Sequence, residues 1–194
     1  MSQQHAGYSN SPTVGDSPTS DSSQLAVAER AAPPHAYGAG LLLLRLTLGL
    51  TMAAHGTQKL FGWFSGPGLD STGKFFTSVG YPSGKTMAVV DGLSELLGGF
   101  GLALGLLTPL AGAAVVGVMI NAMAVKWSGG FFVPTGMEYE VTLAAGAAAL
   151  ALTGPGRLAV DRYLPGVRAH RAGYGIASVT FAVLVAVVVL LARH

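Results

Sequence analysis

The most restrictive feature of this sequence is residues 174–192, YGIASVTFAVLVAVVVLLA, a run without a charged side chain. A helix needs about 20 residues to cross the roughly 30 Å hydrocarbon core of a bilayer, because each residue adds about 1.5 Å. The run therefore predicts a transmembrane helix. Only 10% of the residues in the whole chain are charged, whereas a soluble domain carries roughly 25%. The sequence thus excludes a large soluble enzyme domain.

Four earlier runs have the same apolar character, and they are residues 40–61, 86–107, 109–126 and 138–153. The run at 138–153 is short and rich in alanine. Only a few residues around Pro109 separate the second run from the third, which predicts a tight helical hairpin with proline at a helix start. We therefore expect an all-α transmembrane bundle with five spans, the fifth at the C-terminus.

Residues 1–37 differ from the rest, because they are rich in Ser, Pro, Thr and Gly and lack apolar periodicity. We expect a disordered tail that is not a signal peptide. The chain has no cysteine, which excludes disulfides, thiolate nucleophiles and cysteine-held iron–sulfur clusters. The formal net charge is only +2, with no Lys/Arg block, so we expect no nucleic-acid partner.

The connecting segments predict an orientation. The segment 154–173 is the most basic, with Arg157, Arg162, Arg168 and Arg171, so we expect it in the cytoplasm. Counting spans then puts the N-terminus in the cytoplasm as well, in a multi-pass protein of the cell membrane. The loops 62–84 and 127–137 fall on the outer side and carry aromatic residues that suit the membrane interface. We expect a short interfacial helix at 73–80.

Charged residues within the apolar runs are the main candidate site. Each costs at least about 2.5 kcal/mol at the centre of a membrane helix, so such residues usually face the bundle interior and pair. Relative helix direction brings the polar groups of four runs to one end, and residues four apart share a helix face. We expect an inward cluster of four catalytic candidates, Lys59, Asp91, Glu95 and Glu140, with the binding candidates His55 and Asn121 nearby. Two further binding candidates, Trp63 and Trp127, are expected to line the entrance.

Two interpretations of this cluster remain open. It is either an ion-pair staple that fixes helix register, or a site for a polar head group such as a quinone ring, or for a proton relay. Asp91 and Glu95 share a face, and a low dielectric discourages both from ionising unless they are paired. That arrangement suits proton exchange with a quinone.

Arg45 lies near the opposite end of the first run. We expect it to anchor the chain by extending to the lipid head groups, with pairing to Asp161 as the alternative. The histidines form no ligand set, because His55 stands alone within the runs, so we expect no metal site.

Five short motifs follow one another along the first four runs and just after them. They are RLTLG (45–49), HGTQKL (55–60), ELLGG (95–99), EYE (138–140) and GPGR (154–157). Together they resemble the DoxX family of membrane proteins over about residues 39–163. The resemblance implies a four-helix membrane bundle at 38–163. It leaves outside that bundle the tail at 1–37 and a basic linker with the fifth helix at 164–194.

The resemblance also implies a function, since the family is similar to the membrane subunit of thiosulfate:quinone oxidoreductase. It implies quinone as a ligand that is not covalently bound, and a soluble partner of the sulfurtransferase or dismutase type. Whether the chain is itself an enzyme stays open. The alternatives are a non-catalytic anchor for redox enzymes, or a small proton-coupled transporter, although the runs show no inverted repeat. Whether the chain forms a homo-oligomer also stays open.

Overall fold

The computed structural model describes residues 34–132, 134–164 and 172–193. These residues form six α-helices and three short 3-10 turns at Trp63–Ser65, Trp127–Gly129 and Val160–Tyr163. The α-helices are α2 (Pro34–Phe61), α3 (Gly68–Ser78), α4 (Gly84–Leu104), α5 (Thr108–Lys126), α6 (Glu138–Thr153) and α7 (Ala172–Leu191). The expected all-α bundle with a C-terminal spanning helix is confirmed.

In the described part of the chain, four helices are long and apolar enough to cross a membrane, namely α2, α4, α5 with the turn that follows it, and α7. The run at 138–153 does form a helix, but the 16 residues of α6 extend only about 24 Å. Of the five expected spans, four are therefore candidates by length and composition, and α6 is the short helix that the run at 138–153 predicts. The protein is a multi-pass membrane protein whose apolar outer surfaces contact lipid.

The ends of two expected segments also differ. Helix α2 begins at Pro34, so residues 34–37 of the expected disordered tail are helical. Residues 1–33 lie outside the described part of the chain, as do Arg168 and Arg171 of the basic connection. The expected short helix at 73–80 is present as α3, which begins earlier, at Gly68.

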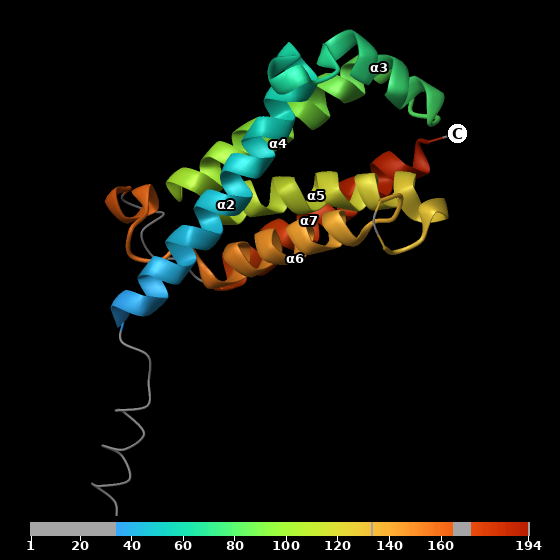
Figure 1. Cartoon of the computed structure of the whole chain (residues 1–194). Coiled ribbons are helices and arrows are strands. Elements are labelled where there is room, and N and C mark those ends of the chain that lie inside the picture. Colours follow the sequence, from blue (N-terminus) through green and yellow to red (C-terminus); the bar gives the residue numbers. More distant parts are fainter. Residues whose placement is uncertain (1–33, 133, 165–171, 194) are drawn as a thin grey trace, which may run out of the picture. The chain divides into compact units, whose positions relative to one another are not determined.

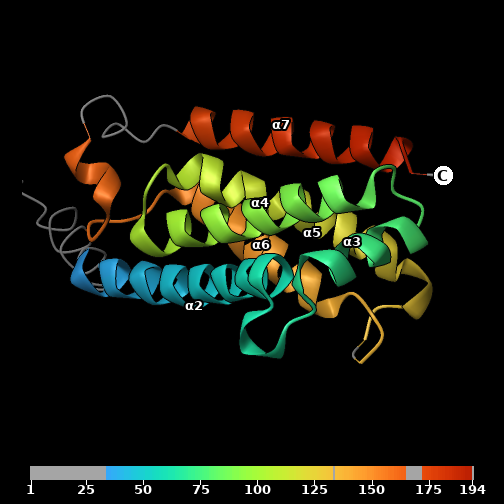
Figure 2. The same ribbon diagram turned by 90° about the horizontal axis from the view of Figure 1, so that it is seen from above.

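The helices lie in two layers, with α2 and α4 side by side in one and α5, α6 and α7 in the other (Figures 1 and 2). Helix α5 is central, because it packs against α4, α6 and α7. The core between the layers contains fully buried apolar side chains, among them Met52, Leu102, Val115 and Leu150.

Glycines allow α2 and α4 to approach closely. A Cβ atom on Gly49 would lie 2.5 Å from the backbone nitrogen of Ala103, and one on Gly56 would lie 2.6 Å from that of Leu96. No side chain fits at those distances. Small residues therefore set the spacing of this helix pair.

The turn between α4 and α5 is the predicted tight hairpin, with proline in the first turn of α5. Its backbone is held by Asp161, which follows α6. Asp161 Oδ1 accepts a hydrogen bond from Leu107 N at 2.6 Å, and Oδ2 accepts from Thr108 N at 3.0 Å and Thr108 Oγ1 at 2.9 Å. Asp161 thus satisfies donors at the start of α5 and ties the segment after α6 to that end of the bundle.

Candidate functional site

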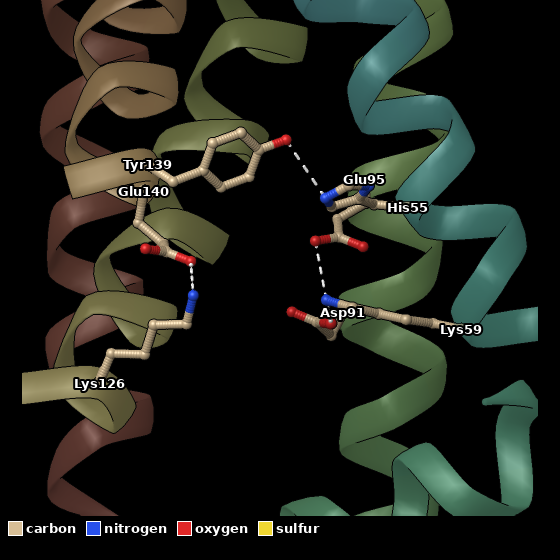
Figure 3. A network of polar contacts seen from close by, with 7 residues as sticks. All are labelled: His55, Lys59, Asp91, Glu95, Lys126, Tyr139 and Glu140. Carbon is tan, nitrogen blue, oxygen red and sulfur yellow. Dashed lines mark hydrogen bonds and ion pairs between the residues drawn. The ribbon is translucent and has the colours of Figure 1, made fainter. Parts of the chain in front are cut away.

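A partly buried ion cluster joins the last turn of α2 to α4. Lys59 Nζ donates to Asp91 Oδ2 at 2.5 Å and to Glu95 Oε1 at 2.8 Å (Figure 3). Asp91 and Glu95 lie one helical turn apart on α4, so a single ammonium group reaches both carboxylates. We call Lys59, Asp91 and Glu95 the α2–α4 cluster.

A second ion pair lies at the same end of the bundle on the other layer. Lys126 Nζ, at the end of α5, donates to Glu140 Oε1 in the first turn of α6 at 2.6 Å. We call these residues the α5–α6 pair. Next to it, Tyr139 Oη is hydrogen-bonded to His55 Nε2 of α2 at 3.3 Å, which links the two layers (Figure 3).

Each group contains a carboxylate oxygen that is buried and has no hydrogen-bond partner within the described residues: Oε2 of Glu95 and Oε2 of Glu140. The side chain of Glu95 is only 1% exposed and that of Glu140 only 7%. Burying an unsatisfied polar atom costs about 1–3 kcal/mol. Such atoms are the natural acceptors for a proton or for a donor on a ligand.

Figure 3 shows the α2–α4 cluster and the α5–α6 pair on facing helices, with the contact between His55 and Tyr139 spanning the space between them. The sequence predicts a single inward cluster of Lys59, Asp91, Glu95 and Glu140. The structure brings these four residues to one end of the bundle but divides them between two ion-paired groups. In the predicted cluster His55 is only a neighbour, whereas in the structure it is hydrogen-bonded to Tyr139 of α6 and so links the two helix layers.

Asn121 faces a different neighbour. Its Oδ1 accepts a hydrogen bond from the Tyr81 hydroxyl at 3.1 Å, and its Nδ2 donates to the Gly117 carbonyl at 3.0 Å. Asn121, Tyr81 and Asp91 line one groove between α4, α5 and α7, with a volume of about 310 Å³. Asp91 therefore belongs both to the α2–α4 cluster and to the wall of this groove.

The two tryptophan side chains are exposed at the surface. Trp63 is 58% exposed and its ring packs on Phe61 at 5.5 Å, while Trp127 is 71% exposed. Neither lines the groove between α4, α5 and α7. Exposed aromatic side chains of this kind suit the membrane interface.

The expectation that Arg45 extends to the lipid head groups is wrong. Its side chain is 1% exposed, and Nη2 donates to the carbonyl of Leu158, so it does not extend to the lipid head groups. The alternative partner, Asp161, accepts hydrogen bonds from the start of α5 with both carboxylate oxygens and interacts with Arg45 through its charge. Arg45 holds the segment after α6 against α2 and is an anchor within the protein.

Sequence reasoning passed over two site residues, Tyr139 and Tyr81. Tyr139 stands directly before Glu140 in the motif EYE, so its place in the first turn of α6 was a usable signal. Tyr81 lies between α3 and α4, and its partner Asn121 is forty residues away, so no local pattern indicates the contact. Within the described residues, no group of three His, Asp or Glu side chains is arranged to hold a metal ion.

Comparison with known proteins supports the resemblance seen in the motifs. The DoxX family profile matches residues 40–128, which span α2 to α5 and include the α2–α4 cluster. This part of the chain belongs to the DoxX family. The EYE and GPGR motifs, helix α6 and helix α7 lie beyond the DoxX match.

A curated relative is an uncharacterized membrane protein of Mycobacterium tuberculosis, 29% identical over 159 residues. That alignment covers 72% of this chain and 94% of the relative. No solved structure matches the chain significantly.

Proposed function

We propose that this DoxX-family membrane protein binds a quinone at the α2–α4 cluster, as the membrane subunit of a redox system. The observation that supports the proposal best is the unpartnered Oε2 of Glu95, buried beside an ammonium group that two carboxylates share. A purely structural ion pair in a membrane interior has no need of a third charge, and the α5–α6 pair does without one.

Charge balance suggests what the cluster does. With all three groups ionised, Lys59, Asp91 and Glu95 carry a formal charge of −1 in a low-dielectric setting. Uptake of one proton at Glu95 Oε2 leaves the cluster neutral, and release of that proton restores the negative charge. The α5–α6 pair is neutral when ionised, so the same argument does not apply to it.

The residues present fit a quinone ring. Lys59 offers an ammonium donor suited to a ring carbonyl, and Asp91 is the carboxylate that reaches the groove. Glu95, the buried partner of Lys59, is the proton acceptor. The hydrogen bond between His55 and Tyr139 continues the series of polar groups toward Glu140. A bound quinone would supply two-electron, two-proton chemistry, while the protein residues hold the ring and exchange protons.

A soluble partner belongs to this proposal. The chain contains no cysteine, so it cannot hold a cysteine-ligated iron–sulfur cluster or a redox disulfide of its own. A redox protein of the sulfurtransferase or dismutase type would exchange electrons with the quinone. The same absence of cysteine favours a second candidate function, a non-catalytic membrane anchor for such a protein. A cytoplasmic N-terminus, from the Arg-rich connection, remains part of the proposal.

The test is quinone binding by protein purified into lipid nanodiscs, with the variants Glu95→Gln and Lys59→Met. We expect each to weaken binding about tenfold or more, which corresponds to about 1.4 kcal/mol. Asp70→Asn is the matched control, because Asp70 forms an exposed ion pair with Lys85 and lies outside both ion-paired groups. Unchanged affinity in both cluster variants would overturn the site and leave the anchor as the better function.

A further inference from the structure

Apart from Ser178 of α7, the polar groups that line the groove between α4, α5 and α7 lie at one end. Tyr81, Asp91 and Asn121 lie there, with Ser94 one turn further along α4. Beyond them the wall is almost entirely apolar and continues to Leu110 near the start of α5. From Asn121 to Leu110 the groove follows α5 for about 16 Å. It therefore suits a molecule with a small polar head and a long apolar chain.

The groove also opens toward the bilayer. Val90 of α4 and Phe181 and Val185 of α7 line it, and all three side chains are exposed at the surface of the protein. In a spanning protein such surfaces face lipid, so a ligand dissolved in the membrane can enter sideways between α4 and α7. Figure 2 shows α7 as the outermost helix on this side, alongside the α4–α5 hairpin.

Helix α7 is fixed in position at the polar end of the groove. Arg193 Nε, just after α7, donates to the Val79 carbonyl at 2.6 Å, and its guanidinium lies 5.6 Å from the centre of the Tyr81 ring. Near its start, Gly175 packs against the backbone of Ala151 in α6. Since α7 is held at both ends, the groove is a preformed feature.

We infer that this groove holds the isoprenoid tail of the quinone, with the ring at Asp91 and helix α7 as one wall of the tail site. The inference rests on the proposed function and adds to it a substrate class, long-chain quinones. The inference depends on Asp91, because Asp91 lines the groove and also belongs to the α2–α4 cluster. Helix α7 lies outside the DoxX match, so tail recognition is a property that this helix adds to the family domain.

Two valines of α7 provide a matched test. Val185 lines the groove and Val187 does not, yet each is 44% exposed. Val185→Trp fills the groove, whereas Val187→Trp adds the same bulk on a lipid-facing surface. Ser178→Phe blocks the groove nearer its apolar end, with Ala177→Phe as its exposed neighbour and control. Affinity is measured in nanodiscs for a quinone with a long isoprenoid tail and for the same ring without a tail.

The unmodified protein is expected to bind the long-tailed quinone at least tenfold more tightly than the tail-less ring. Val185→Trp and Ser178→Phe should abolish that difference, while binding of the tail-less ring and both controls stay unchanged. If the unmodified protein binds both quinones but the groove variants have no effect, the tail site is wrong and the proposed function stands. If it binds neither quinone, the proposed function fails, and the tail site with it. Loss of a co-purified phospholipid without loss of quinone binding would assign the groove to phospholipid and overturn the inference.

Discussion

Lys59 and Glu95 form an ion pair across the close contact of α2 with α4, with 2.8 Å between Lys59 Nζ and Glu95 Oε1. The ion pair can form because glycines on both helices, among them Gly56 of α2 and Gly92 of α4, let the two backbones approach closely. Glu95 is almost completely buried, whereas Asp91, which shares the same ammonium group, reaches the groove. One lysine thus connects a buried carboxylate to a carboxylate that a membrane ligand can reach.

The first prediction concerns charge balance in this cluster. Lys59→Met leaves the buried carboxylate of Glu95 and the partly buried carboxylate of Asp91 without their cation. Leaving a buried charge unpaired in this way costs about 3 kcal/mol. Adding Glu95→Gln removes one of the stranded charges, so the double variant should be more stable than Lys59→Met alone. Unfolding in mixed detergent micelles measures both. A double variant less stable than Lys59→Met alone would show that Lys59 does not neutralise the charge of Glu95.

The second prediction concerns the glycine contact between α2 and α4. Gly49→Ala forces the helices apart, because its Cβ would lie 2.5 Å from backbone atoms of Gly99 and Ala103, and we expect a loss of about 1–3 kcal/mol. Gly40→Ala on the same helix is the control, because nothing lies within 4 Å of a Cβ there. The control should be neutral or stabilising by about 0.5–1 kcal/mol. Equal melting temperatures for the two variants would contradict the close packing.

The third prediction concerns the cap on α5. Asp161→Ala removes three accepted hydrogen bonds from Leu107 and Thr108 and should destabilise the protein by about 2 kcal/mol. Asp161→Asn retains one acceptor oxygen and should cost less. Hydrogen exchange at the start of α5 localises the effect. Unchanged protection in Asp161→Ala would contradict the capping role.

The fourth prediction concerns alkaline pH. Burial raises the pKa of the Tyr81 phenol, and the positive charge of Arg193 opposes this only in part. A raised pKa in the folded state means that the phenol stabilises the protein fully below its ordinary pKa of about 10. This contribution is lost as the pH rises through the folded pKa. The stability difference between the unmodified protein and Tyr81→Phe should therefore shrink above about pH 10, and a constant difference would contradict it.

Much of this fold could be predicted because apolar run length is a strong signal in membrane proteins. The hairpin at Pro109 and the final helix follow directly from the runs, and Lys59, Asp91 and Glu95 meet because helix direction and four-residue spacing leave little choice. The residues that escaped prediction depend on three-dimensional packing. The burial of Arg45 requires the segment after α6 to fold back over it, and the Tyr81–Asn121 contact joins distant parts of the chain.

The division of the charges into two groups could not be read from the sequence either. Lys126 and Glu140 pair because α5 and α6 are neighbours in the same layer, whereas the sequence constrains only which end of the bundle they occupy. The groove at Asp91 depends on where α7 packs, and the apolar pattern of α7 allows any of several faces to turn inward.

The central claim is that a quinone ring lies at the α2–α4 cluster. It is tested most directly by photolabelling the protein in nanodiscs with a quinone whose ring carries the reactive group, followed by peptide mapping. The account predicts labelling within residues 55–59 and 91–95, abolished by excess unlabelled quinone. Labelling confined to other helices, or labelling that unlabelled quinone fails to reduce, would contradict it.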